Sequence, residues 1–135
     1  METILVIDDD LYMRDILEDL LSLDEYSVIS AENGVEGIEK FKEHNPELVL
    51  TDLVMPKKDG LSFIQEVKDE NPEARIIAVS GSSDLNLISD VVSAKVNRIL
   101  TKPFNIDELL DAVAELLDAK ADTGQTYAHH HYPRA

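Results

Sequence analysis

The 135-residue sequence contains no cysteine, and it has few aromatic residues, with three Phe and four Tyr. The absence of cysteine excludes disulfide bonds, thiolate zinc sites and cysteine nucleophiles. No apolar run approaches the roughly 18 residues that a membrane helix needs. The N-terminus has no basic segment before its short apolar run, unlike a secretory signal peptide. We therefore expect a cytoplasmic protein with no membrane insertion.

Positive charge is also scarce. Lys and Arg number 12 against 28 Asp and Glu, which gives a formal net charge of −16 at pH 7. Binding to nucleic-acid phosphates needs a basic patch, and the sequence has none, so we expect no direct contact with nucleic acid. Anionic membranes are disfavoured for the same reason. The charge instead favours Mg²⁺ and basic protein partners.

Two hydrophobic rhythms alternate along the chain. Five short apolar runs, at 4–7, 26–30, 46–51, 75–80 and 97–101, are typical of buried strands. Between them, apolar residues recur at spacings of three and four, as on one side of a helix. These residues are Met13, Ile16, Leu17, Leu20 and Leu21; Val35, Ile38 and Phe41; Leu61, Ile64 and Val67; Leu87, Ile88, Val91 and Val92; and Ile106, Leu109, Leu110, Val113 and Leu117.

Helix starts are marked by polar residues. Asn33 with Glu36, and Asn105 with Glu108, have the spacing of capping boxes.

The predicted elements follow each other as five strand–helix units, (βα)₅, which indicates a mostly parallel sheet with helices on both faces. Because five units are too few for a closed eight-stranded barrel, we predict an open, doubly wound α/β sheet.

The periodic pattern stops after Lys120. We predict one domain over residues 1–119 and a mobile C-terminal tail over 120–135. The tail carries three adjacent histidines, but adjacent histidines in a flexible tail rarely form a preorganised metal site. They are His129, His130 and His131.

Polar residues close four of the five predicted strands. Ligands of open α/β sheets bind beyond the carboxyl ends of the strands, so these groups are expected to meet at one edge. The second strand ends at Ala31 without a charged residue, which places it away from this site. The polar groups are Asp8, Asp9 and Asp10 after the first strand, Asp52 after the third, Ser80, Gly81 and Ser82 after the fourth, and Thr101, Lys102 and Pro103 after the fifth.

Three of these carboxylates, Asp8, Asp9 and Asp52, would repel each other at one edge. A hard cation relieves such repulsion, and oxygen-only ligation suits Mg²⁺. Lys102 adds a cation and Ser80 a hydroxyl, so the set suits phosphoryl transfer with a carboxylate oxygen as the nucleophile. An isolated strand-end Asp is more simply a turn or cap residue. That simpler role is what we expect for Asp10, at the start of the first helix.

Four segments together resemble the receiver domain of bacterial two-component response regulators of the chemotaxis-regulator type. They are VIDDD (Val6–Asp10), TDLVMPKKDG (Thr51–Gly60), AVSGS (Ala78–Ser82) and TKPF (Thr101–Phe104), in order and each at its expected strand end. The resemblance extends from about Met1 to Ala119. It implies a flavodoxin-like fold with strand order 2-1-3-4-5.

The resemblance also implies roles for individual residues. Asp52 resembles the phospho-acceptor aspartate, Asp9 the direct Mg²⁺ ligand, and Asp8 the acid that holds a metal-bound water. The remaining matches are the backbone carbonyl of Val54 as a third protein ligand of the metal, Lys102 as the phosphoryl-binding lysine before a cis peptide to Pro103, Ser80 as the hydroxyl that turns toward the phosphoryl group, and Gly60 as the turn glycine after the acceptor loop.

Some positions depart from the family pattern. The family often carries Gly-Ala before the fifth strand and an aromatic residue within it, where this chain has Lys95, Val96 and Ile99. That aromatic changes rotamer when the hydroxyl residue moves, so the usual readout is absent. Val54 and Ser82 occupy positions that tune hydrolysis of the acyl phosphate in the family, and neither side chain can assist water as an acid or base.

The predicted function is that of a phosphorylation-dependent signalling switch. A histidine kinase or histidine phosphotransfer protein would donate a phosphoryl group to Asp52, and the switched surface would bind a downstream protein. The resemblance implies a monomer or a phosphorylation-dependent dimer, and no turnover of a separate substrate. One alternative is a scaffold module that phosphate does not switch. A haloacid-dehalogenase-type phosphatase would need a second Asp at the position of Val54.

Overall fold

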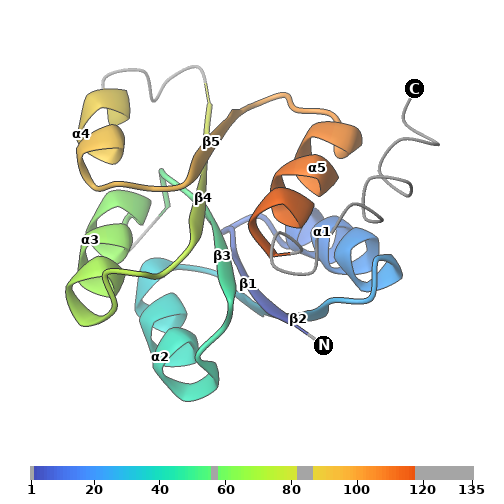
Figure 1. Ribbon diagram of the computed structural model, residues 1–135, viewed down its shortest axis with the longest axis horizontal. Helices are drawn as coiled ribbons and strands as arrows, with labels where there is room; N and C mark the ends of the chain where they lie inside the picture. Colours follow the sequence, from blue (N-terminus) through green and yellow to red (C-terminus); the bar gives the residue numbers. More distant parts are fainter. Residues whose placement is uncertain (1, 56–57, 82–86, 118–135) are drawn as a thin grey trace.

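The computed structural model describes residues 2–55, 58–81 and 87–117. In this part of the chain, strands and helices alternate as predicted (Figure 1). The strands are β1 (Thr3–Ile7), β2 (Ser27–Ala31), β3 (Leu48–Asp52), β4 (Ile76–Ser80) and β5 (Arg98–Thr101). The helices are α1 (Leu11–Leu23), α2 (Gly34–His44), α3 (Gly60–Glu70), α4 (Ile88–Ser93) and α5 (Ile106–Leu117).

The five strands form one parallel sheet in the order β2-β1-β3-β4-β5, which confirms the expected flavodoxin-like strand order. The order reverses at β1, because β2 lies on one side of it and β3 on the other. Ile7 of β1 is opposite Thr51 of β3. The residues that follow them, Asp8 and Asp52, therefore leave neighbouring strands at the same edge.

Helices cover both faces of the sheet. Figure 1 shows α2, α3 and α4 on one side and α1 and α5 on the other. Each side has its own apolar core: Phe63, Ile64 and Val67 pack on the first, and Leu21, Leu109 and Val113 pack on the second. The strands between these cores are buried on both faces, which explains their continuous apolar sequences.

Side-chain caps mark where four helices begin, and the capping residues are Asp10 for α1, Asn33 for α2, Asp59 for α3 and Asn105 for α5. The predicted capping box between Asn105 and Glu108 is present in both directions, at 2.7 and 3.1 Å. Asn33 accepts the Glu36 amide at 2.9 Å, but the Glu36 carboxylate accepts the amide of Glu32 rather than that of Asn33. As predicted, Asp10 caps α1, where its side chain accepts the amide of the second helical residue.

The predicted apolar stripes are wrong at three positions. Val35, Val92 and Ile106 are 47%, 59% and 48% exposed. Val35 and Ile106 belong to the first turn of their helices, next to the connections from β2 and β5. In α2 the buried residues of that turn are Gly34 and Gly37, so Val35 lies on the exposed side. Helix α4 has six residues, of which only Val91 is buried, so Val92 faces away from the sheet.

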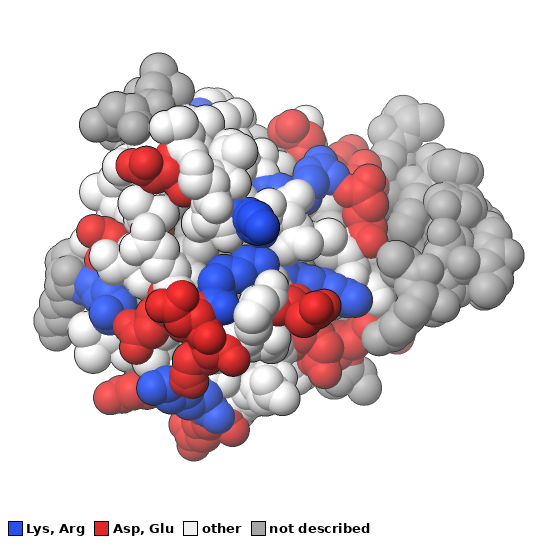
Figure 2. Space-filling model, turned by 60° about the vertical axis from the view of Figure 1, so that its left-hand side comes forward, with Lys and Arg blue, Asp and Glu red and all other residues white. Residues whose placement is uncertain are grey.

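Charged side chains of both signs lie on the surface (Figure 2). On the face drawn in Figure 2, basic side chains lie in a band across the middle with acidic side chains beside it.

None of the helices in the described ranges combines the length and the apolar character that crossing a bilayer requires. The predicted domain boundary at 119, the tail 120–135 with its histidines, and Ser82 lie outside the described residues.

Candidate functional site

Three carboxylates meet at the carboxyl edge of the sheet, as the strand-end pattern predicts. Asp8, Asp9 and Asp52 each place a carboxylate oxygen within 4.8 Å of the other two. Asp8 and Asp52 are buried and Asp9 is exposed. Three acidic oxygens at this spacing can surround one cation, and all-oxygen ligation is what Mg²⁺ prefers.

The backbone holds Asp8 tightly. Its amide donates to the Ala31 carbonyl at 3.2 Å, and its Oδ1 accepts the Asp10 amide at 2.9 Å. Its carbonyl accepts a hydrogen bond from Nη1 of Arg14 at 2.6 Å. The sequence patterns did not point to Arg14, because it comes from inside a helix and binds a backbone atom.

Asp52 ends β3 as a buried carboxylate with one donor on each oxygen. Its Oδ1 accepts the Leu53 amide at 3.0 Å, and its Oδ2 accepts Nζ of Lys102 at 3.2 Å. Burial raises the pKa of Asp52 above its ordinary value, although the charge and hydrogen bond of Lys102 oppose that rise. Lys102, the cation expected at this edge, therefore contacts the Asp52 carboxylate directly.

The pKa values of Asp8 and Lys102 are also raised, but for different reasons. Burial raises the pKa of Asp8, the Asp10 amide opposes that rise, and the charge of Asp52 adds to it. Burial disfavours the charge on Lys102, but the nearby Asp52, with Asp8 and Asp9, raises the Lys102 pKa overall. One lysine faces three carboxylates, so negative charge remains in excess and a metal cation would offset it.

Ser80 lies at the end of β4 on the same edge. It is fully buried, and its Oγ has no hydrogen-bond partner among the described residues. An unsatisfied buried hydroxyl costs about 1–3 kcal/mol. Its carbonyl accepts the Lys102 amide at 2.8 Å, which links the ends of β4 and β5. The Lys102–Pro103 peptide bond is cis, as the resemblance implies.

Gly60 closes the loop that follows Asp52. Its amide donates to the Leu53 carbonyl at 2.8 Å. A Cβ at Gly60 would lie 2.1 Å from the Asp52 carbonyl oxygen and 2.7 Å from the Leu53 Cα. Both contacts are with backbone, so only glycine allows the helix to begin this close to the acceptor strand. Val54, in the same loop, has a side chain that is 57% exposed.

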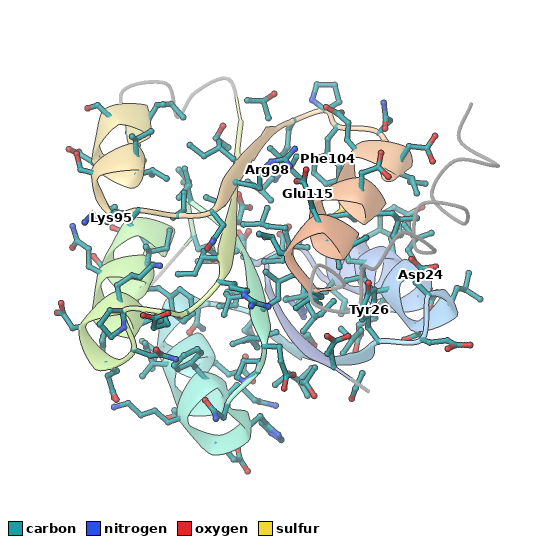
Figure 3. The ribbon with its side chains drawn as sticks, viewed as in Figure 1. Asp24, Tyr26, Lys95, Arg98, Phe104 and Glu115 are labelled. Carbon is teal, nitrogen blue, oxygen red and sulfur yellow. The ribbon has the colours of Figure 1, made fainter. Side chains whose placement is uncertain are left out.

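The departures from the family pattern lie around β5. Ile99 is partly buried and packs against the apolar core on the α2–α4 side. Lys95 has a φ of 65°, in the left-handed region where glycine is favoured, which explains why glycine suits this position. Arg98 of β5 and Glu115 of α5 form an ion pair and point toward each other (Figure 3).

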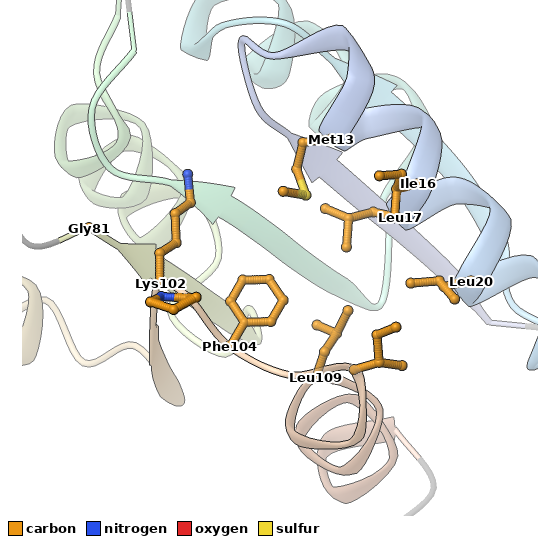
Figure 4. Close-up of a pocket in the computed structure, with 10 residues that line it drawn as sticks. Met13, Ile16, Leu17, Leu20, Gly81, Lys102, Phe104 and Leu109 are labelled. Carbon is orange, nitrogen blue, oxygen red and sulfur yellow. The ribbon is translucent and has the colours of Figure 1, made fainter.

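A pocket of about 660 Å³ adjoins the site. It lies between α1 and the connection from β5 to α5, with Lys102 at one end (Figure 4). Most of its lining is apolar and includes Met13, Leu17, Phe104 and Leu109. The candidate site thus has an acidic, lysine-containing centre beside an apolar hollow.

Comparisons with known proteins match this architecture. The family model of the response regulator receiver domain matches residues 4–114. The chemotaxis protein CheY of Bacillus subtilis (strain 168) is 36% identical over 116 residues, which cover 85% of this chain and 97% of that protein. A receiver domain structure from Clostridium thermocellum has a TM-score of 0.84 at 28% identity, covering 90% of this chain and 98% of that one.

A second solved structure bears on the acidic site. The response regulator TrrA of Thermotoga maritima, solved in complex with Mg²⁺-BeF, has a TM-score of 0.79 at 35% identity, and the match covers 87% of this chain and all of that one (100%). The family model and the CheY relative both span most of the chain. The four matching segments and the shared fold therefore agree, and the chain belongs to the response regulator receiver domain family.

Proposed function

We propose that this receiver is a signalling switch in which Asp52 accepts a phosphoryl group from a phosphohistidine of a histidine kinase or phosphotransfer protein. The observation that carries the proposal is the meeting of the Asp52 carboxylate with two further carboxylates and the Lys102 ammonium. An Asp52 oxygen attacks phosphorus, the P–N bond to the imidazole breaks with its electron pair going to nitrogen, and an acyl phosphate forms.

The residues present fit Mg²⁺ as the cofactor. We propose that the carboxylates of Asp8, Asp9 and Asp52 and the carbonyl of Val54 hold it, with Asp8 acting through a bound water. The metal supplies positive charge that offsets the charge on the phosphoryl oxygens. The all-oxygen donor set and the raised pKa of the two buried carboxylates support this assignment.

Lys102 and Ser80 are proposed to bind the new phosphoryl group. Lys102 Nζ already contacts Oδ2 of Asp52. In the reaction this oxygen either forms the bond to phosphorus or stays next to the phosphorylated oxygen. The Ser80 hydroxyl is buried and has no partner among the described residues, so a phosphoryl oxygen would supply the acceptor it lacks. Movement of Ser80 toward that oxygen would displace the chain that follows β4.

The partner that supplies the phosphoryl group is proposed to be a protein that docks around the site. Exposed apolar side chains follow three strands that end at the acidic edge: Leu11 and Tyr12 after β1, Val54 after β3, and Ile106 after β5. The pocket between α1 and α5 extends this apolar surface (Figure 4). Exposed apolar patches bordered by polar residues are typical of protein interaction sites. The output surface is proposed to be α4, β5 and α5, which contact a downstream protein.

Acetyl phosphate tests the proposal. We expect incubation with acetyl phosphate and Mg²⁺ to add about 80 Da, the mass of one phosphoryl group, in an acid-labile form. Asp52→Asn is expected to abolish the adduct. Asp59→Asn is the matched control, because Asp59 lies in the same loop but is exposed and caps α3. No adduct on the unmodified chain, or an adduct that survives Asp52→Asn, would contradict the proposal.

One observation favours a second function, a scaffold module that phosphorylation does not switch. Ile99 stands where the family often has the aromatic readout residue, and it is packed against the core. Beryllofluoride with Mg²⁺ mimics the phosphorylated state, so partner affinity with and without it separates the two functions. An affinity that changes supports the switch, and an unchanged affinity supports the scaffold.

A further inference from the structure

We infer that Arg14 is a positioning residue for the proposed Mg²⁺ site, acting through the backbone between Asp8 and Asp9. The inference rests on the proposed function of this site. Arg14 lies in α1, and its Nη1 donates to the Asp8 carbonyl at 2.6 Å, six residues back along the chain. A hydrogen bond from a charged donor at this distance is among the stronger ones in proteins.

The position of Arg14 in its helix gives it no other evident purpose. It is the fourth residue of α1, close to the positive end of the helix dipole, where a cation is unfavourable. Glu18, four residues later, could pair with it on the helix surface. In the described parts of the chain, however, no carboxylate lies within 4.0 Å of the Arg14 guanidinium. Its guanidinium instead donates a hydrogen bond to the Asp8 carbonyl.

This hydrogen bond fixes the peptide unit that leads into Asp9. The Asp8 carbonyl and the Asp9 nitrogen belong to the same planar group, so holding the oxygen sets the direction in which Asp9 continues. The Asp8 amide and carboxylate are held separately, by Ala31 and by Asp10. Arg14 therefore holds the Asp8 carbonyl, which those two hydrogen bonds do not hold.

Asp9 depends on its backbone more than the other two carboxylates do. Its side chain is exposed, and no hydrogen bond among the described residues holds its carboxylate. Asp8 and Asp52, in contrast, are buried and each accepts a backbone amide. Loss of groups that orient metal ligands commonly weakens metal binding by about 10- to 100-fold. We expect Arg14 to act within this range.

The charge of Arg14 predicts the opposite result. A guanidinium near the site would repel Mg²⁺, so its removal would tighten binding if charge were its main effect. Positioning predicts weaker binding when Arg14 is replaced. The sign of the change in affinity therefore separates the two roles.

Calorimetric titration with Mg²⁺ alone tests the inference, with four proteins compared: the unmodified chain, Arg14→Met, Arg14→Lys and Arg75→Met. Arg75 is the matched control, because its Nη1 donates to the Leu116 carbonyl at 2.7 Å, away from the acidic site. We expect Arg14→Met to raise the dissociation constant about 10-fold. Arg14→Lys is expected to bind Mg²⁺ more tightly than Arg14→Met but more weakly than the unmodified chain. Arg75→Met is expected to leave the Mg²⁺ affinity unchanged.

Hydrogen exchange provides a readout that needs no metal. The Asp10 amide donates to Asp8 Oδ1, so it reports the order of this turn in the metal-free protein. We expect it to exchange several-fold faster in Arg14→Met than in Arg75→Met. Unchanged Asp10 exchange, or Mg²⁺ affinity that is unchanged or tighter in a folded Arg14→Met protein, would overturn the inference. Failure of acetyl phosphate to modify Asp52 would refute the proposed function alone, because the exchange result does not depend on phosphorylation.

Discussion

Asp8 and Asp52 are buried acidic residues whose charge costs this fold stability. Each is a buried carboxylate, and burial raises the pKa of both above the ordinary value of 3.8. Each accepts a backbone amide, and Asp52 also accepts Lys102, so their charges are only partly compensated. Residues whose charge is unfavourable in the folded protein commonly mark functional sites. Their pH dependence can therefore be predicted from the structure.

The metal-free protein is expected to lose stability as the pH rises from about 4 toward neutrality. A carboxyl group whose pKa is raised on folding binds its proton more tightly in the folded state, so its contribution is full below 3.8 and is lost as it ionises. Asp8→Asn removes this loss and retains an oxygen for the Asp10 amide. We expect the variant to melt about 3–5 °C higher at pH 7, equivalent to about 1 kcal/mol.

Thermal unfolding in EDTA at several pH values checks this prediction. The difference between Asp8→Asn and the unmodified protein is expected to shrink as the pH falls toward 4. Asp19→Asn is the control, since Asp19 is an exposed residue of α1. A difference that stays constant with pH, or an equal gain from Asp19→Asn, would show that burial of Asp8 is not its origin.

At this scale the sequence predicts much of the site, but not all of it. Asp8, Asp9, Asp52 and Lys102 could be predicted to meet because parallel strands bring their carboxyl ends to one edge. No periodic pattern predicts Arg14, because its partner is a backbone carbonyl, and every residue offers one. The burial of the Ser80 hydroxyl without a partner likewise depends on packing, which sequence spacing does not contain.

Among the elements, the turn between α4 and β5 is the one that departs most from the family pattern. Lys95 adopts a φ of 65° there, and its amide donates to the Val92 carbonyl at 3.0 Å, which ends the helix. Helices commonly end with a left-handed residue at this position, usually glycine. A side chain in this conformation costs about 1–2 kcal/mol.

Lys95→Gly is therefore expected to stabilise the protein. Relief of the left-handed strain is partly offset by about 0.5–1 kcal/mol, because glycine has more freedom in the unfolded chain. The net gain is expected to be about 0.5–1 kcal/mol in urea unfolding, with an unchanged dependence on urea concentration. The gain would be local to the end of α4 and independent of Mg²⁺.

Two other turns provide matched comparisons. Glu25, between α1 and β2, has a φ of 71°, and Asn45, after α2, has a φ of 48°. Glu25→Gly should give a gain similar to that of Lys95→Gly. Asn45→Gly should change stability little, because asparagine already tolerates this conformation. Equal effects at all three positions would mean that the left-handed conformation is not what limits stability.

The elements themselves were predictable, but their ends were less so. The order of strands and helices follows from the change of hydrophobic period, and the capping residues Asn33 and Asn105 mark two helix starts. The stripe pattern does not fix the burial of the first apolar residue of a helix, so Val35 and Ile106 were expected inside and are exposed. The exposed Ile106 side chain is part of the surface proposed for docking.

For the whole molecule, the dominant feature is its charge. A net charge of −16 on 135 residues disfavours the compact state through self-repulsion, and three of the acidic side chains are concentrated at one edge of the sheet. Simple salt screens the general repulsion, whereas a bound cation also neutralises the local cluster. The two effects can be separated by comparing NaCl with MgCl₂ at equal ionic strength.

We expect both salts to raise the melting temperature, and MgCl₂ to raise it more. Binding to the folded state alone at ten times the dissociation constant stabilises by about 1.4 kcal/mol. Asp9→Asn is expected to abolish the excess from MgCl₂ and to keep the gain from NaCl, because Asp9 is exposed and its loss leaves the core intact. Thermal unfolding of the three proteins, unmodified, Asp9→Asn and Asp19→Asn, gives the measurement.

Asp19→Asn makes the comparison specific, because it removes the same charge from an exposed position on α1. It should retain the full excess from MgCl₂. If Asp9→Asn also retained it, Mg²⁺ would be acting as a general counterion, and the acidic cluster would not be a metal site. If Asp9→Asn alone lost it, the carboxylates that repel each other at the sheet edge would be joined by the ion, and the cost of assembling them would be recovered only when Mg²⁺ is present.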